Sequence, residues 1–232
     1  MNHEITHNPA FAMLRVDLQP GERLVAEPGA MVAMTRNINL EAKLTTSASP
    51  GFGATVKALL AAVVRKYLGG ESFFVSHYTT PQPGSVWIAP GLSGGISHTK
   101  LENGRMMMSS GAYLASTGNI DVSAKYGGIR GVLAKEGAFF LQVSGTGDVW
   151  FNSFGGVEVI DVQGTYMVDN GHIVAWTGDL RYTMKSAGGG LVGMFASGEG
   201  IVCEFQGNGK LWIQSRNMQS IVSWIIPLLP AK

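Results

Sequence analysis

GDVW at Gly147–Trp150 is one of three occurrences of the pattern Gly-x-(Val/Leu)-Trp in this chain. The others, at a nearly constant spacing, are GSVW at Gly84–Trp87 and GKLW at Gly209–Trp212. A second pattern, Gly-x-(Met/Tyr/Ile)-(Val/Leu)-Ala, precedes each of them, as GAMVA from Gly29, GAYLA from Gly111 and GHIVA from Gly171. Self-similarity at a fixed period is the signature of an internal repeat. The sequence therefore predicts three copies of one unit.

Each copy continues into a segment in which apolar and polar residues alternate. The three segments are NINLEAK at Asn37–Lys43, NIDVSAK at Asn119–Lys125 and DLRYTMK at Asp179–Lys185. Alternation with a period of two is typical of a strand with one buried face. We expect that face to carry Ile38, Leu40 and Ala42 in the first copy, Ile120, Val122 and Ala124 in the second, and Leu180, Tyr182 and Met184 in the third.

The first copy is longer than the others because of an Ala- and Leu-rich insertion at residues 47–68. Apolar residues recur there at helical spacing, at Phe52, Val56, Leu59, Leu60, Val63, Val64 and Tyr67. The insertion is expected to form a helix. That helix either packs on the β core or docks on a membrane surface or a protein partner.

We therefore predict an all-β fold with three β-sandwich or prism-like repeats, one helical insertion and an apolar C-terminal segment, forming one domain over residues 1–232. The expected units are approximately residues 10–91 (with the insertion 47–68), 92–155 and 156–217, followed by a tail at 218–232. Residues Ile221–Pro230 are unusually apolar for the end of a chain, so we expect a cover over them. The cover is the inserted helix, a neighbouring subunit or a membrane. The candidate contact residues are Val56, Leu59, Leu60, Val63, Tyr67, Trp224, Ile225 and Ile226.

Composition limits the classes of partner and compartment. The formal net charge is +1 and only 14% of residues are charged, whereas nucleic-acid binders usually carry a strong basic excess. A single cysteine, Cys203, excludes an internal disulfide. The first nine residues show no leader pattern and no apolar run is long enough to span a bilayer. We expect a cytoplasmic protein, with peripheral membrane attachment as the alternative.

No catalytic, cofactor or metal site emerges from the motifs. Ser93 lies in GLSGG, a formal nucleophile-elbow match, but the residues after it look extended where that motif requires a helix. The five histidines lack metal-ligand spacing, and His172 occupies a repeat position held by Ala in the other copies. Cys203 is in phase with buried apolar neighbours, and the recurring Glu71, Glu136 and Glu199 favour a structural hairpin role. We predict a protein that is not an enzyme and needs no cofactor.

Several stretches together resemble one family. They are Leu18–Met34, Gly69–Phe74, Gly84–Gly91, Ser109–Ser116, Val168–Trp176, Ser197–Phe205 and Ile213–Asn217. They resemble the mitochondrial-biogenesis family named for altered inheritance of mitochondria, in a prokaryotic-type form long counted as a domain of unknown function. The resemblance implies a β-rich fold related to the trp RNA-binding attenuation protein, often a homo-oligomer. Eukaryotic members are tied to organisation of the mitochondrial inner membrane, and the family supplies no catalytic residues.

Three hypotheses about function remain open from the sequence. The first is a non-enzymatic scaffold or interaction protein that forms a homo-oligomer, with a membrane surface or protein as a further partner. The second is a small-ligand-binding β domain or an uncharacterised enzyme, which requires a deep pocket with polar lining. The third, single-stranded nucleic-acid binding, ranks last because the predicted solvent faces carry mixed charges.

Overall fold

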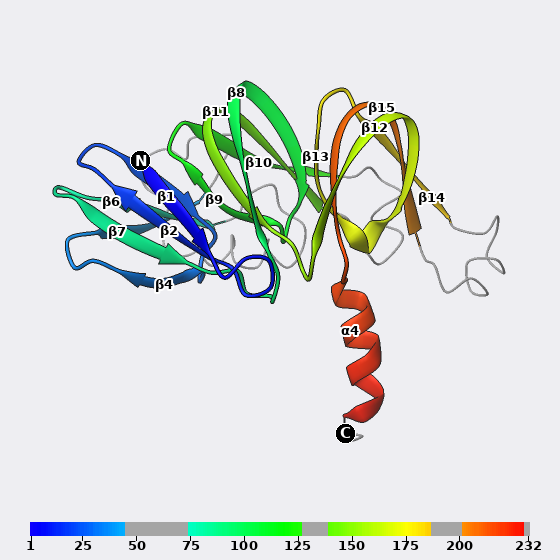
Figure 1. Cartoon of the computed structure of the whole chain (residues 1–232), viewed down its shortest axis with the longest axis horizontal. Coiled ribbons are helices and arrows are strands. Elements are labelled where there is room, and N and C mark those ends of the chain that lie inside the picture. Colours follow the sequence, from blue (N-terminus) through cyan, green and yellow to red (C-terminus); the bar gives the residue numbers. More distant parts are fainter. Residues whose placement is uncertain (45–73, 127–138, 187–200, 230–232) are drawn as a thin grey trace.

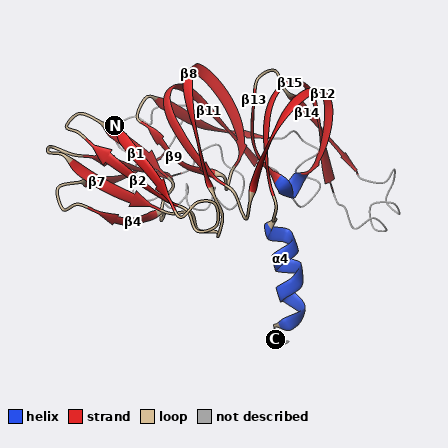
Figure 2. Cartoon of the chain, viewed as in Figure 1, coloured by secondary structure: helices blue, strands red, loops and turns tan. Residues whose placement is uncertain are grey.

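The computed structural model describes residues 1–44, 74–126, 139–186 and 201–229 (Figure 1). It is almost entirely β, with one short α-helix that stands away from the strands (Figure 2). The helical elements are η1 (Asn170–His172), α4 (Met218–Ile225) and η2 (Ile226–Leu228). The strands are β1 (Asn2–Thr6), β2 (Met13–Leu18), β3 (Arg23–Ala26), β4 (Met31–Met34), β5 (Asn39–Leu44), β6 (Phe74–Thr79), β7 (Gly84–Ile88), β8 (Ile96–Ser109), β9 (Tyr113–Thr117), β10 (Ile120–Tyr126), β11 (Phe139–Asn152), β12 (Val157–Asp169), β13 (Ile173–Thr177), β14 (Arg181–Ser186) and β15 (Ile201–Gln214).

These strands form two open, antiparallel sheets. A four-stranded sheet has the order β1-β2-β7-β4. An eleven-stranded sheet has the order β12-β15-β13-β8-β11-β9-β3-β6-β5, with β10 paired to β11 and β14 paired to β15. The all-β class predicted from the sequence is confirmed. In Figure 1 the chain runs across the molecule, with its first strands at one end, β12 to β15 at the other, and α4 pointing away from the body.

The two sequence patterns meet as partners in the sheets. The Ala of the first pattern pairs with the Trp of the second in each case, Ala33 with Trp87, Ala115 with Trp150 and Ala175 with Trp212. Each ladder also has a register shift next to that pair. The surroundings differ, since Trp150 and Trp212 are buried while Trp87 is half-buried beneath the guanidinium of Arg15. The repetition of whole units, and their boundaries, stay predictions.

Two long strands bend at a Gly-x-Gly sequence. β11 pairs with β10 up to Gly145 and with β9 from Val149 onward. β15 pairs with β14 up to Gln206 and with β13 from Leu211 onward. Gly145 and Gly207 have φ of +129° and +127°, and a Cβ on Gly207 would lie 2.7 Å from the carbonyl oxygen of Asp179. Only glycine adopts this backbone without strain. Gly145 therefore lets β11 pair first with β10 and then with β9, and Gly207 lets β15 pair first with β14 and then with β13.

The stretch that leads to the first Gly-x-(Val/Leu)-Trp pattern is divided into two strands, β6 and β7, where β11 and β15 are each continuous. Pro81 and Pro83 lie between β6 and β7. Proline cannot donate to a ladder, and here β6 belongs to the larger sheet while β7 belongs to the smaller one. The two prolines therefore coincide with the point where the small sheet separates from the large one.

Side-chain burial follows the predicted alternation in two of the three segments. Ile120 and Val122 on β10 are buried, as is Leu180 before β14. The prediction is wrong in the first copy, where Ile38 is buried but Leu40 is 43% exposed and Ala42 is also exposed. Within the described residues β5 is an end strand of its sheet and pairs with β6 alone, so pairing gives it support from one side. The predicted inserted helix at 47–68 lies outside the described residues.

The core consists of three clusters that follow one another along the body. The first packs Leu14, Val16 and Ile88 around Trp150, which joins the small sheet to the large one. The second packs Phe151 and Trp212 with Met106 and Met108 of β8, and the third centres on Trp176 and Phe205. Trp150 and Trp212 therefore fill the junctions between successive parts of the body, whereas Trp87 belongs to none of the three clusters.

Candidate functional site

The helix α4 forms because its first turn is capped and its interior lacks glycine and proline. Asn217 has extended backbone angles, and its Oδ1 accepts a hydrogen bond from the backbone N–H of Ser220 at 2.7 Å. This is the standard N-cap arrangement, which satisfies one of the free donors at a helix start. Pro227 lies in the following 3₁₀ turn, where a continuing α-helix is disfavoured.

Asn217 also ties the helix to the β body. Its Nδ2 donates to Nε2 of His172 at 2.8 Å, and Nδ1 of His172 donates to the carbonyl oxygen of Gln214 at 2.7 Å. The side chain of Gln214 in turn accepts from the backbone N–H of Phe154 at 2.8 Å and donates to the carbonyl of Gly171 at 3.0 Å. His172 therefore links the cap of α4 to the β body, with Nδ1 as donor and Nε2 as acceptor in these two bonds.

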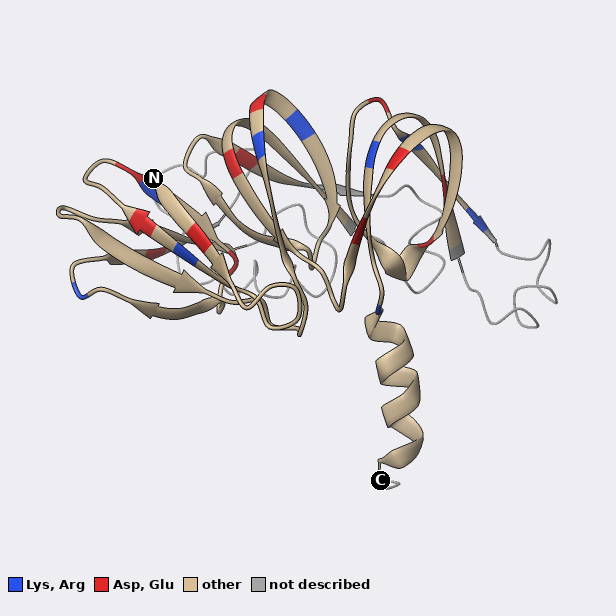
Figure 3. Ribbon diagram, viewed as in Figure 1, with Lys and Arg blue, Asp and Glu red and all other residues tan. Residues whose placement is uncertain are grey.

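The surface of α4 and η2 is apolar and open. None of the residues of α4 is buried. The large apolar side chains left exposed are Met218 (45%), Val222 (44%), Trp224 (70%), Ile225 (38%), Ile226 (59%), Leu228 (69%) and Leu229 (60%). No residue from Asn217 to Ala231 is charged, and the ribbon of α4 is free of charged residues beyond its start (Figure 3). Soluble monomers rarely expose so many neighbouring apolar side chains, so we take this segment as the candidate interaction surface.

An apolar crevice of about 400 Å³ opens at the base of the helix. Its lining comes from the loop between β1 and β2, the loop between β7 and β8, the turn after β11 and the residues around the start of α4. These are Pro9, Ala10, Phe11, Ser93, Phe154, Gly155, Gly156, Arg216 and Ile221. Phe11 is 73% exposed. The apolar surface of α4 therefore continues onto the body.

The predicted contact residues divide into two groups. Trp224, Ile225 and Ile226 lie together on α4 and the start of η2, and all three are exposed. Val56, Leu59, Leu60, Val63 and Tyr67 lie outside the described residues. The expected cover over the tail is not supplied by the described body, because each side chain of Val222–Leu229 is exposed. No helix in the described ranges has the length and hydropathy needed to cross a membrane.

Sequence reasoning missed the anchor of the helix and the crevice. Asn217 directly before an apolar run was a usable signal, because Asn is a preferred N-cap. The partnership of Asn217 with His172, and the approach of Phe11 to Ile221, join residues far apart in the chain, so no local pattern could have indicated them.

Two other candidates from the sequence, Ser93 and Cys203, have ordinary structural surroundings. Ser93 lies in a loop, and its carbonyl accepts a bond from the backbone N–H of Gly155 at 2.9 Å. Cys203 is fully buried, and burial raises the pKa of its thiol to about 11. Glu71, Glu136 and Glu199 lie outside the described residues.

The fold brings together two histidines that the sequence keeps apart. His3 on β1 and His98 on β8 have ring centroids 4.4 Å apart, and both rings lie against Trp150. His98 Nε2 is 2.9 Å from Oδ1 of Asp148. Burial and the neighbouring His98 lower the pKa of His3. Among the described residues no group of three or more His, Cys, Asp or Glu side chains has an arrangement that could hold a metal ion.

The β body is similar to known proteins over almost its whole length. A family model described as "Mitochondrial biogenesis AIM24" matches residues 3–216. An uncharacterized protein of Streptococcus pyogenes serotype M6 is 30% identical over 237 residues, which cover 99% of this chain and 92% of that protein. A Streptococcus pyogenes protein with an X-ray crystal structure is 29% identical, with a TM-score of 0.80, covering 98% of this chain and 99% of that one. The family match ends directly before Asn217, the cap of α4.

Proposed function

The chain belongs to the Mitochondrial biogenesis AIM24 family, and from its β body and exposed helix we propose that it is an interaction protein that self-associates through α4 and catalyses no reaction. The observation that carries this proposal is the apolar surface of α4 and η2, which the described body leaves open. That the protein catalyses no reaction is an expectation from its sequence motifs, and it forms part of this proposal.

The spacing of apolar residues on α4 favours another helix as its partner. Met218, Ile221, Val222 and Ile225 recur at i, i+3, i+4 and i+7, which places them in one stripe. Stripes of this kind pack side by side in helix pairs and bundles. Gln219, Ser220 and Ser223 lie between them on the polar side. A second copy of this chain presents the same stripe, so the two helices are complementary to one another.

Charge also favours a second copy over a lipid surface. Identical segments approach without like-charge repulsion when neither carries a charge, as here from Asn217 to Ala231. Interfacial membrane helices usually combine an apolar face with several Lys or Arg residues. Arg216, at the base of the crevice, is the basic residue next to α4 in the described chain.

The available apolar surface is enough for an association of moderate strength. Seven large apolar side chains between Met218 and Leu229 are exposed, and burying the exposed part of each contributes on the order of 1–2 kcal/mol. Burying them on both copies contributes at most about 20 kcal/mol, against a cost of about 4–15 kcal/mol for bringing two molecules together. We therefore expect an oligomer that dissociates on dilution, unless the crevice near Phe11 adds further contacts.

Analytical ultracentrifugation across a concentration series tests this proposal. Val222→Glu/Ile225→Glu places two charges in the apolar stripe and is expected to give monomers. The matched control, Gln219→Glu/Ser223→Glu, adds the same two charges on the polar side of α4 and is expected to associate like the unchanged protein. Far-UV circular dichroism checks that the β body is unaltered in both variants.

Three results would overturn self-association through α4. They are a wild-type protein that stays monomeric at every concentration, equal association of the wild type and the stripe variant, or equal loss of association in both variants. Flotation with lipid vesicles is the companion measurement. A monomeric protein that floats, and loses flotation in the stripe variant, would identify a lipid surface as the partner.

A further inference from the structure

A second hollow, of about 330 Å³, lies where β8, β11, β13 and β14 meet. Met107 on β8 pairs with Gln142 on β11 and with Trp176 on β13. Residues directly opposite one another in a ladder share one face of the sheet. These three side chains therefore form a floor across three adjacent strands, and Tyr182 of β14 stands beside it with its ring centroid 5.3 Å from that of Trp176.

The aromatic part of this hollow is held in place by packing. Trp176 is only 3% exposed. Its ring lies 4.8 Å from that of Phe140 and 5.2 Å from that of Phe205, both measured between centroids. Edge-to-face contacts of this kind fix the orientation of the rings. The ring of Trp176 is therefore already in position before a ligand binds.

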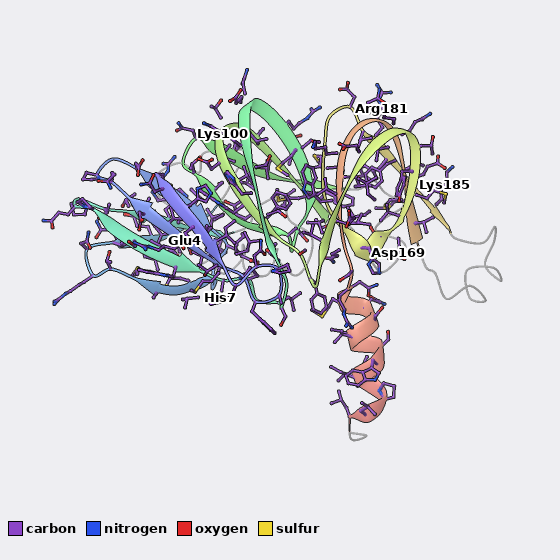
Figure 4. All side chains as sticks on the ribbon, in the orientation of Figure 1. Glu4, His7, Lys100, Asp169, Arg181 and Lys185 are labelled. Carbon is purple, nitrogen blue, oxygen red and sulfur yellow. The ribbon has the colours of Figure 1, made fainter. Side chains whose placement is uncertain are left out.

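Two arginines line the same hollow. Arg105 lies two residues before Met107 on β8, so it stands on the same face of the sheet. Arg181 begins β14, at the end of the third unit opposite α4 (Figure 4). Both are exposed, and in the part of the chain that the structure describes neither has an ion pair or a side-chain hydrogen bond. By contrast, Arg15 is 3.0 Å from Asp17 and Lys185 is 2.7 Å from Glu204.

Two of the lining residues, Trp176 and Arg181, differ from the residues at the corresponding positions of the other copies of the sequence pattern. Trp176 directly follows the Ala of GHIVA, where the second copy has Ser116. Arg181 occupies the third position of the alternating segment that follows, where the other copies have Asn39 and Asp121. If the shared β architecture required Trp and Arg at these positions, all three copies of the pattern would carry them. Trp176 and Arg181 instead supply an aromatic surface and a cation at one place in the molecule.

We propose that this hollow binds a small organic anion that carries a carboxylate or phosphate group on an apolar body. Guanidinium groups stay charged at all ordinary pH values and bind planar oxyanions with two parallel hydrogen bonds. Met107 and Trp176 offer an apolar floor for the rest of the ligand, and Gln142 offers an amide. The volume lies at the lower end of the range for small-molecule sites. This inference does not depend on self-association through α4.

Isothermal titration calorimetry with four simple probes tests the proposal. Phenyl phosphate and benzoate carry the oxyanion on an apolar ring, inorganic phosphate lacks the ring, and benzyl alcohol lacks the charge. Arg105→Gln and Arg181→Gln each remove one guanidinium from an exposed position. Lys100→Gln is the matched control, because Lys100 is also an exposed cation on β8 but pairs opposite Asp148 and does not line the hollow (Figure 4).

The expected result is binding of phenyl phosphate, benzoate or both, weakened roughly tenfold by each arginine substitution and unchanged by Lys100→Gln. The tighter of the two probes identifies the oxyanion. Four results would overturn the proposal. They are no binding of phenyl phosphate or benzoate, equally strong binding in the arginine variants, an equal loss of binding in Lys100→Gln, or binding of inorganic phosphate or benzyl alcohol as tight as that of phenyl phosphate and benzoate. Melting temperatures of the variants within the wild-type range show that a lost signal is not a loss of fold.

Discussion

Replacing Asn217 by Ala is expected to unwind α4 while the β body stays folded. Asn217 makes two bonds that Ala cannot, one from the Ser220 backbone N–H to its Oδ1 at 2.7 Å and one from its Nδ2 to His172 Nε2 at 2.8 Å. The first caps the helix, and the second fixes the cap to the body. Both are lost together because they come from one amide group.

The size of the effect follows from these two bonds. Loss of an N-cap costs about 1 kcal/mol, and loss of a partly buried hydrogen bond costs about as much again. A total of about 2 kcal/mol lowers the ratio of helical to unwound α4 about thirtyfold. An isolated helix this short is marginal in water, and no residue of α4 is buried, so packing within one chain does not offset the loss.

The assay is the backbone Cα chemical shift of residues 221–224, measured at a concentration at which the protein is monomeric. Asn217→Ser is the matched control. Its hydroxyl oxygen still caps the Ser220 N–H, but the shorter side chain lacks the Nδ2 that donates to His172, so only one bond is lost and the ratio should fall about fivefold. Urea unfolding of the β body should be the same in all three proteins.

Two outcomes would refute this reasoning. Helical shifts in Asn217→Ala equal to those of the wild type would show that the cap and its link to His172 do not hold α4. An equal loss of helix in Asn217→Ala and Asn217→Ser would show that the link to His172 alone matters.

Two further predictions concern titratable groups in the body. Stability should fall as the pH drops below the ordinary histidine value of 6.5, because burial and His98 lower the pKa of His3, burial lowers that of His77, and the unfolded chain then takes up protons that the folded chain resists. Urea unfolding at about pH 7.5 and about pH 5.5 measures this; His3→Gln should reduce the difference, and an unchanged difference would count against His3. The thiol of Cys203 should not react with a disulfide reagent until the protein is unfolded, because it is fully buried and its pKa is raised to about 11. Rapid stoichiometric labelling of the native protein would contradict that.

Local patterns were sufficient to predict much of the β body. The alternation at Ile120 and Val122 correctly indicated a strand with one buried face, because period-two contacts are decided within a few residues. The same rule failed at Leu40. Whether an apolar face is covered depends on what the rest of the chain packs against it, and within the described residues β5 has a strand on one side only.

The candidate sites depended on long-range contacts and were only partly predictable. An apolar tail with Trp224 at its centre was evident from composition, but its capping by Asn217 and its separation from the body were not. Arg105 on β8 and Arg181 on β14 are far apart in the chain and meet at one hollow only because β8 pairs with β13. The clue available in the sequence was that Trp176 and Arg181 differ from the residues at the matching positions of the other two copies of the pattern.

The double pairing of β8 has a consequence for any shortened form of this protein. β8 pairs with β11 along most of its length and with β13 through Met106, Met107 and Met108. A truncated protein that ended before β13 would leave the backbone N–H and C=O groups that Met106, Met107 and Met108 direct toward β13 without hydrogen-bond partners. Such a fragment would expose an unpaired strand edge and is expected to aggregate or to pair with other chains. In the full chain β13 covers this edge of β8 and thereby protects it from pairing with another chain.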